Sequence, residues 1–169
     1  MGILKFCPKC GQETLQFDGE KKFSCHQCNF VLYHNCAAAV AVIIRCGDEV
    51  LLTKRNQNPR LGKLDLAGGF VDPKESAENT CARELYEELG IEIDQKKLNF
   101  LMSLPNIYHY KEIDYNTLDL FFEYQVDEKI NAVKLETNEI AEAIWVKISE
   151  LNVDEIAFDS QKNFFYLYH

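Results

Sequence analysis

The chain has 169 residues, of which 47% are hydrophobic and 12% aromatic, enough for one ordinary domain with a small appendage. Its net charge of −9 argues against a general affinity for the backbone of nucleic acids, which is also negatively charged. No stretch approaches a membrane span, so we expect a cytoplasmic protein with neither a membrane nor a nucleic acid as its partner.

Four cysteines near the N-terminus form two C-x2-C pairs, Cys7 with Cys10 and Cys25 with Cys28, which are separated by fourteen residues. Two such pairs can present four thiolates to one tetrahedral Zn²⁺. The segments 14–17 and 21–23 between them predict a hairpin, and the pattern over residues 1–34 resembles a zinc ribbon. Four thiolates complete the coordination of the metal, so we expect a structural zinc that stabilises a very small core.

A redox-active cysteine pair is the alternative, but it needs a βαβ context that the sequence lacks. The other cysteines, Cys36, Cys46 and Cys81, stand alone, and we expect them to be small core residues. An odd total of seven cysteines is typical of a chain in a reducing compartment.

The main domain is expected at residues 35–169, and no linker rich in Gly, Pro or Ser separates it from the ribbon. We therefore expect the ribbon to dock against it. Residues 39–44 predict a buried strand, Gly47-Asp48 a hairpin turn, and residues 50–55 the partner strand.

A polar loop follows at residues 56–63. Three cations are candidates to bind phosphate groups of a ligand: Arg55 at the end of the strand, and Arg60 and Lys63 in the loop. Each of these side chains is equally well explained as an ordinary surface charge.

A glycine-rich loop at residues 64–72 precedes a helix that we expect to begin at Asp72-Pro73. In this helix Glu84, Glu87 and Glu88 fall within an arc of about 100°, at about 100° per residue. Like charges at this spacing destabilise a helix by about 0.2–0.5 kcal/mol per pair. A bound cation removes that repulsion, and oxygen ligands suit Mg²⁺ or Mn²⁺. A Glu-rich surface helix is the alternative for this triplet taken alone.

The full pattern resembles the Nudix box, G-x5-E-x7-R-E-U-x-E-E-x-G-U, in which U is a bulky aliphatic residue. The specified positions are filled by Gly69, Glu75, Arg83, Glu84, Leu85, Glu87, Glu88, Gly90 and Ile91. The resemblance implies an α/β protein, an α/β/α sandwich around a mixed sheet, preceded here by the ribbon. It also implies a hydrolase that cleaves the pyrophosphate bond of a nucleoside diphosphate linked to another group, such as ADP-ribose or NADH.

Metal ligands follow from the resemblance position by position: Glu84, Glu87, Glu88, the carbonyl of Gly68, and Glu139 as the carboxylate of a late loop, with Glu136 behind it. Glu84 stands where many relatives activate water. Glu75 is expected to support Arg83 and the start of the helix. One departure is Ala67, where relatives commonly have proline; it removes no functional group.

Further strands are predicted at residues 98–104, 117–126 and 143–146, and a terminal amphipathic helix at residues 154–168. We expect the aromatic residues of that helix to be core and interface residues rather than a platform for stacking bases.

A zinc ribbon ahead of a Nudix domain resembles the NADH pyrophosphatase group, whose members carry Ser-Gln-Pro-Trp-Pro-Phe-Pro-x-Ser after the box. Of this motif, residues 103–111 keep Ser103, Pro105 and an aromatic residue at Tyr108. Loss of the tryptophan and of two prolines removes a stacking surface and the rigidity that holds it. We therefore expect a small nucleotide substrate, with ADP-ribose cleaved at least as well as NADH.

Two other classes of function remain as alternatives. One is a nucleotide sensor with the same fold and no catalysis, which has no need of an intact acidic triad. The other is an adaptor that binds through its zinc ribbon. A homodimer is the assembly to be considered.

Overall fold

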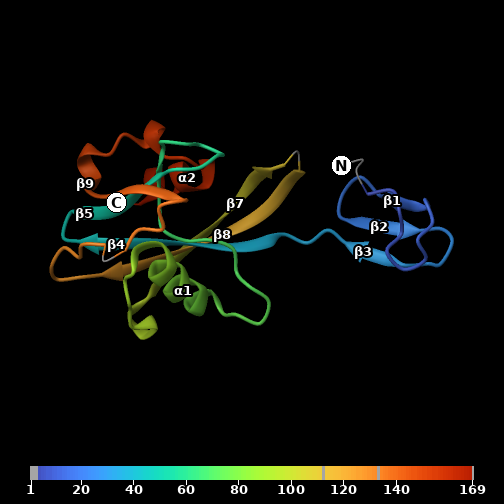
Figure 1. The fold of residues 1–169 in the computed structure, drawn as a ribbon, viewed down its shortest axis with the longest axis horizontal. Helices are drawn as coiled ribbons and strands as arrows, with labels where there is room; N and C mark the ends of the chain where they lie inside the picture. The colour runs from blue at the N-terminus through green and yellow to red at the C-terminus, as the bar shows by residue number, and fades with distance from the viewer. Residues whose placement is uncertain (1–3, 112, 133, 169) are drawn as a thin grey trace.

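The structure is a computed structural model that describes residues 4–111, 113–132 and 134–168. The predicted limits of the two domains, residues 1 and 169, lie outside the described residues. The chain forms a three-stranded sheet near the N-terminus and a separate six-stranded sheet with helices on both faces (Figure 1). None of the described helices is both long enough and apolar enough to cross a membrane.

The N-terminal sheet contains β1 (Leu15–Phe17), β2 (Lys22–Cys25) and β3 (Val31–Tyr33), all antiparallel. The hairpin of β1 and β2 confirms the sequence-based prediction, whereas β3 was not expected. Leu15 and Phe23 are buried against Cys7 and Cys25, which makes a core of few side chains. A unit with so small a core needs a further source of stability.

The expected docking of the ribbon is not observed. Across the described residues, no hydrogen bond or ion pair joins residues 4–34 to residues 37–168. Figure 1 shows the ribbon beyond one end of the main sheet, on the extension of β4 (Ala37–Cys46). The first residues of β4 already pair with β8, Ala37 opposite Thr117, so only the irregular residues 34–36 connect the two sheets.

The main sheet has the strand order β6-β5-β4-β8-β7, with β9 on the other edge of β5. Its other strands are β5 (Glu49–Arg55), β6 (Leu64–Asp65), β7 (Asn99–Tyr110), β8 (Ile113–Gln125) and β9 (Ile140–Lys147). The pair of β4 and β8 is parallel and the other pairs are antiparallel, which confirms a mixed sheet. Strands β7 and β8 form a hairpin longer than the sequence predicted.

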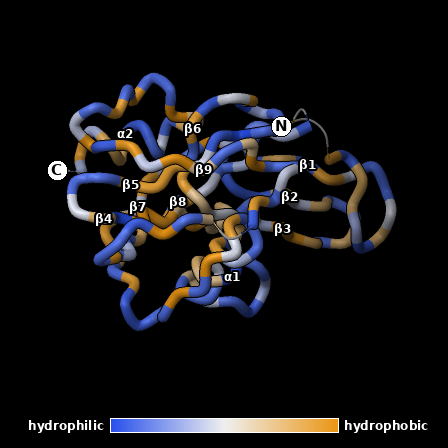
Figure 2. The backbone as a smooth tube through the Cα atoms, turned by 60° about the vertical axis from the view of Figure 1, so that its left-hand side comes forward, coloured by the Kyte–Doolittle hydropathy of each residue, from blue (hydrophilic) through white to orange (hydrophobic). Residues whose placement is uncertain are grey.

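Two hydrophobic layers lie on opposite faces of this sheet, because successive side chains of a strand point to opposite sides. Along β4, Val42 and Ile44 pack toward α1 (Ala77–Leu89), whereas Ala41 and Ile43 pack toward α2 (Asp159–Leu167). Figure 2 shows apolar residues concentrated along the central strands. The α/β/α sandwich is therefore confirmed.

Three short 3-10 helices complete the described elements: η1 (Gln95–Lys97), η2 (Ile148–Glu150) and η3 (Val153–Glu155). The predicted terminal helix is shorter than expected, since η3 and the irregular residues 156–158 occupy its first part. The predicted helix start at Asp72-Pro73 is also wrong. Lys74 has a φ of 75°, which a helix does not allow, and Ser76 is the N-cap of α1.

Candidate active site

The glycine-rich loop extends the main sheet along the free edge of β4. The N–H groups of Val42 and Val40 donate to the carbonyls of Ala67 and Gly69 at 2.9 and 2.8 Å. A Cβ at Gly68 would lie 2.1 Å from the carbonyl oxygen of Val40, and one at Gly69 would lie 2.4 Å from Oε1 of Glu84. Both glycines are therefore required for the loop to lie between β4 and α1.

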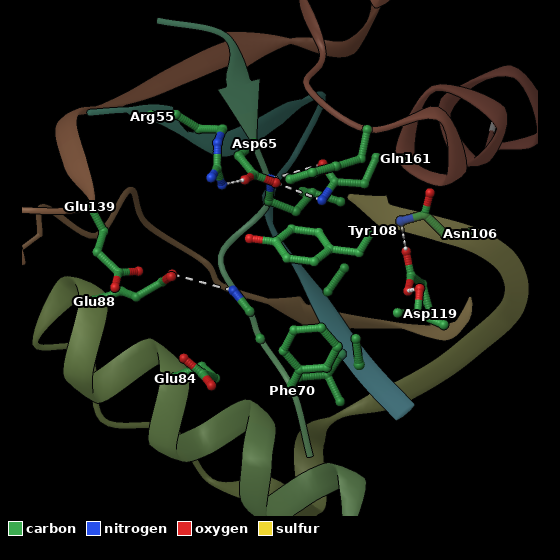
Figure 3. A pocket seen from close by; sticks show the side chains of 18 of the residues that line it. Arg55, Asp65, Phe70, Glu84, Glu88, Asn106, Tyr108, Asp119, Glu139 and Gln161 are labelled. Carbon is green, nitrogen blue, oxygen red and sulfur yellow. Dashed lines mark hydrogen bonds and ion pairs between the residues drawn. The ribbon is translucent and has the colours of Figure 1, made fainter. Parts of the chain in front are cut away.

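Helix α1 is fixed at both ends by its own sequence. The hydroxyl of Ser76 accepts a hydrogen bond from the N–H of Asn79, and Gly90 ends the helix with a φ of 66°. Leu85 and Leu89 are fully buried in the core. This packing directs Glu84 and Glu88, one turn apart, toward the glycine loop (Figure 3).

Arg83 neutralises part of the acidic cluster. Its guanidinium pairs with Glu75 at 3.1 Å, with Glu84 at 2.8 Å and with Glu87 at 3.0 Å. Hydrogen bonds from Arg83 and Thr80 lower the pKa of Glu75. Glu75 thus lies against Arg83, as the resemblance to the Nudix box implied.

Glu88 has no such partner among the described residues; the N–H of Gly68 donates to its Oε2 at 3.3 Å. Its side chain faces the cavity but is densely surrounded by protein. Burial, followed by the nearby charges of Asp65 and Glu84, raises the pKa of Glu88 well above its ordinary value. Burial also raises the pKa of Glu84. The excess of carboxylate oxygens favours a hard divalent cation such as Mg²⁺ or Mn²⁺.

A cavity of about 420 Å³ contains these groups. Glu84, Glu88, Glu139, Asp65, Gly68 and Arg55 line one part of it, and Phe70, Tyr108, Phe158, Asn106, Thr117 and Asp119 line the rest. The loop before β9 supplies Glu139, whose carbonyl accepts from the N–H of Asn56 at 2.7 Å. Glu84, Glu88 and Glu139 face one space. Their carboxylate oxygens are more widely separated than the four cysteine sulfurs of the ribbon, which all lie within 4.8 Å of one another.

Glu87 does not line this cavity. It is exposed in a neighbouring hollow with Tyr86, Lys134, Glu136 and Asn138, and Glu84, Glu88 and Glu139 border both spaces. The structure therefore brings together four of the five predicted metal ligands, Gly68 included, and places Glu87 at their margin.

The predicted phosphate-binding cations are separated. Arg55 lines the cavity, with Nη1 2.6 Å from Oδ2 of Asp65 and its guanidinium over the ring of Phe158. Lys63 instead pairs with Glu155 at 3.2 Å, away from the cavity. Arg60 does not line the cavity either.

Sequence reasoning missed Asp65 and Gln161. The amide of Gln161 donates to Oδ1 of Asp65 at 2.6 Å and accepts from the N–H of Leu66 at 3.1 Å. These contacts join residues about a hundred positions apart, so no local pattern could reveal them. Only Asp65 could have been suspected from the sequence, because it is a charged residue inside an otherwise apolar segment before the glycines.

The ribbon cysteines converge as predicted. Their sulfurs lie 3.6 Å apart for Cys7 and Cys28, 3.8 Å for Cys10 and Cys25, and 3.6 Å for Cys25 and Cys28. A tetrahedron with Zn–S bonds of about 2.3 Å has edges of about 3.8 Å. The hydroxyl of Thr14, 3.0 Å from Sγ of Cys25, lowers the pKa of that thiol to about 6 and so favours the thiolate. The cluster fits a zinc ion.

Comparison with solved structures agrees with this fold. A NUDIX hydrolase from Nitrosomonas europaea matches with a TM-score of 0.63 and 24% identity, over 98% of this chain and 93% of that one. A bifunctional NMN adenylyltransferase/ADP ribose pyrophosphatase from Francisella tularensis, complexed with AMP and a Mn ion, matches with a TM-score of 0.60 and 19% identity, over 80% and 42%.

Comparison with protein sequences gives relatives of higher identity than the solved structures do. The NAD-capped RNA hydrolase NudC of Mannheimia succiniciproducens is 32% identical over 152 residues, which are 86% of this chain and 53% of that protein. The protein of the same name from Haemophilus influenzae is 32% identical over 143 residues, 83% and 50% respectively. The chain spans about half the length of these relatives. The family model of the NUDIX domain matches residues 34–167, and the chain belongs to the Nudix family.

Proposed function

We propose that this protein hydrolyses the pyrophosphate bond of a nucleoside diphosphate linked to another group, with Mg²⁺ or Mn²⁺ as cofactor. The products are a nucleoside monophosphate and a phosphorylated remainder. One observation carries the proposal: Glu84 and Glu88 lie against the glycine loop in a cavity that also contains Glu139 and Arg55. A panel of nucleoside diphosphate derivatives, assayed with each metal and with identification of the products, tests it.

Each group has a role that its position supports. Glu84, Glu88, Glu139 and the carbonyl of Gly68 would hold the cations, with Glu87 completing the set from the margin. A bound divalent metal would neutralise the charge of the diphosphate and lower the pKa of a bound water molecule. Glu84 would accept the proton of the attacking water. Arg55, held by Asp65, would orient a phosphate, which a planar guanidinium can bind through two oxygens.

We also propose that Cys7, Cys10, Cys25 and Cys28 hold one structural Zn²⁺. Four sulfur ligands leave no open position for water, so the ion stabilises the ribbon and does not act in hydrolysis.

Replacement of both Cys7 and Cys10 with serine should therefore unfold the ribbon and remove about one zinc per chain, while kcat changes by less than about threefold. Metal analysis and calorimetry measure both effects. The matched control is Cys36→Ser, because Cys36 lies outside the cluster and is exposed, so the expectation that it is a core residue was wrong. A protein purified without zinc, with unchanged melting, would contradict the assignment.

The substrate is proposed to be ADP-ribose or a similar compound. Asn106 stands at the position of the motif's tryptophan, and it lines the cavity together with Tyr108. A pocket without that tryptophan has lost a stacking surface for the reduced nicotinamide.

We expect kcat/KM for ADP-ribose to equal or exceed that for NADH, measured on the same preparation. A preference for NADH of about tenfold, or about 1.4 kcal/mol of transition-state stabilisation, would show that the altered residues still favour the dinucleotide.

The sequence relatives are named NAD-capped RNA hydrolases, which favours a second candidate substrate. In it the pyrophosphate bond links the cap to the 5′ end of an RNA chain. The net charge of −9 opposes binding of an RNA backbone. The same assay with an NAD-capped oligoribonucleotide beside free NAD, at low and high salt, separates the two candidates.

A further inference from the structure

Part of the cavity is formed by neighbouring positions of β7 and β8. Asn106 and Tyr108 of β7, with Thr117 and Asp119 of β8, line the same space. Asn106 is directly opposite Thr117 in the antiparallel register, so alternation along both strands places the four side chains on one face. Figure 3 shows Asn106 and Asp119 on the opposite side of Tyr108 from Glu84 and Glu88.

Asp119 is the centre of a buried hydrogen-bond network without a basic side chain. Its Oδ1 accepts from the hydroxyl of Thr117 at 2.7 Å, and its Oδ2 accepts from the hydroxyl of Ser160 at 2.6 Å and from Nδ2 of Asn106 at 2.9 Å. Thr117, Asp119 and Ser160 are 3%, 8% and 1% exposed. Within the described part of the chain, no ion pair compensates this carboxylate.

This network fixes which atoms face a ligand. A carboxylate oxygen only accepts hydrogen bonds, so Asn106 must turn its NH₂ group toward Asp119 and its Oδ1 away from it. No hydrogen bond among the described residues engages that Oδ1. Thr117 has likewise used its only hydroxyl proton. The Oδ1 of Asn106 is therefore left to accept a hydrogen bond from a ligand, while the second N–H of Asn106 and the hydroxyl of Tyr108 remain as donors beside it.

We propose that Asn106, oriented by Asp119, forms a specificity subsite for a planar –NH₂ group of the substrate. The amide oxygen of Asn106 would accept one of its hydrogens. The exocyclic amine of adenine and the carboxamide of nicotinamide share this chemistry. A keto oxygen or a carboxylate placed against Oδ1 of Asn106 would meet another acceptor and lie near the carboxylate of Asp119, so it would bind there less well than an –NH₂ group.

The proposal rests on the proposed function, since it assigns substrate selection within the same cavity. Asp119 acts as a positioning residue: it orients the amide of Asn106, and the contact with the ligand is made by Asn106.

Two substrate pairs test the subsite with the intact protein. ADP-ribose against its hypoxanthine analogue changes only the amine of the nucleoside base. NAD against its nicotinic acid analogue changes only the carboxamide. We expect kcat/KM to favour the amine-bearing member of one pair by at least about tenfold, and the pair that responds identifies which –NH₂ group is bound. Equal kcat/KM for the two members of each pair would overturn the proposal.

Variants then locate the discrimination. Asn106→Leu should reduce the ratio of kcat/KM within that pair to below about twofold. Asp119→Asn should also reduce the ratio, although Asn106 is intact, because an amide at position 119 no longer fixes the orientation of Asn106. The matched control is Asn116→Leu, an exposed position of β8 that does not line the cavity and should keep the full ratio. A ratio that survives Asn106→Leu would refute the role of Asn106.

A binding measurement keeps this inference separate from the proposed function. If the protein hydrolyses none of these compounds, calorimetric titration with AMP and IMP, and with nicotinamide and nicotinic acid mononucleotides, still measures the selectivity. Preference for the –NH₂ member of one pair, lost in Asn106→Leu, would support the subsite even when hydrolysis fails. Equal affinities within both pairs would overturn it.

Discussion

Replacement of Glu88 with glutamine is expected to lower turnover by at least about a hundredfold and to leave the fold intact. Glu88 lies in the cavity beside Gly68 and has no basic partner among the described residues. Glutamine has nearly the same shape as glutamate but lacks the negative charge that would bind a cation. Because the buried site favours a neutral group at this position, folding should not suffer. Glu84→Gln should have a loss of similar size.

Steady-state kinetics at saturating Mg²⁺ or Mn²⁺, with circular dichroism of the same samples, measures both parts of this expectation. Glu78→Gln is the matched control, because Glu78 is exposed in the first turn of the same helix. A Glu88→Gln protein with a near-normal rate would move the active site elsewhere.

The two glycines of the loop should respond differently to alanine. Gly68→Ala introduces a Cβ 2.1 Å from the carbonyl oxygen of Val40 in β4, at a φ of 153°. Neither backbone can yield without breaking sheet hydrogen bonds, so we expect a loss of at least about 2 kcal/mol in the free energy of unfolding. For a chain of this length that is a fall of about 4–8 °C in Tm.

Gly69→Ala should instead act on turnover. Its Cβ would lie 2.4 Å from Oε1 of Glu84, and that side chain can move away, which displaces a proposed metal ligand. We expect a loss of at least about tenfold in kcat, with little change in Tm. Gly62→Ala is the control for left-handed strain without a clash, since Gly62 has a φ of 80° and no neighbour within 4 Å. If Gly68→Ala melts like Gly62→Ala, the close approach of loop and strand is not what requires glycine.

The sequence predicted the parts of this protein that depend on local order. A continuous apolar run identified β4, and the Gly47-Asp48 turn after it identified β5 as its partner. Fixed spacing identified the helix that carries Glu84 and Glu88, and the ribbon cysteines. Such patterns are visible because the spacing between their residues along the chain is fixed, within about twenty positions.

The parts that sequence reasoning missed depend on distant contacts. Asp65 joins Gln161 of α2, and Asp119 joins Ser160 of the same helix. Only the packing of α2 against the sheet brings these residues together. Glu139 was predicted as a metal ligand through family resemblance alone, because nothing in its own neighbourhood distinguishes it from other surface carboxylates; the structure places it at the cavity. The start of α1 was misplaced because Asp72-Pro73 is a typical start signal, yet Lys74 adopts a positive φ that postpones the helix to Ala77.

Product analysis of ADP-ribose with the purified protein and Mg²⁺ or Mn²⁺ tests the central claim most directly. We predict equal amounts of AMP and ribose 5-phosphate, formed only with the divalent metal, abolished by EDTA and reduced at least about a hundredfold in Glu88→Gln. Absence of metal-dependent cleavage of ADP-ribose and of every related nucleoside diphosphate compound by folded protein, or cleavage at a bond other than the pyrophosphate, would contradict the account.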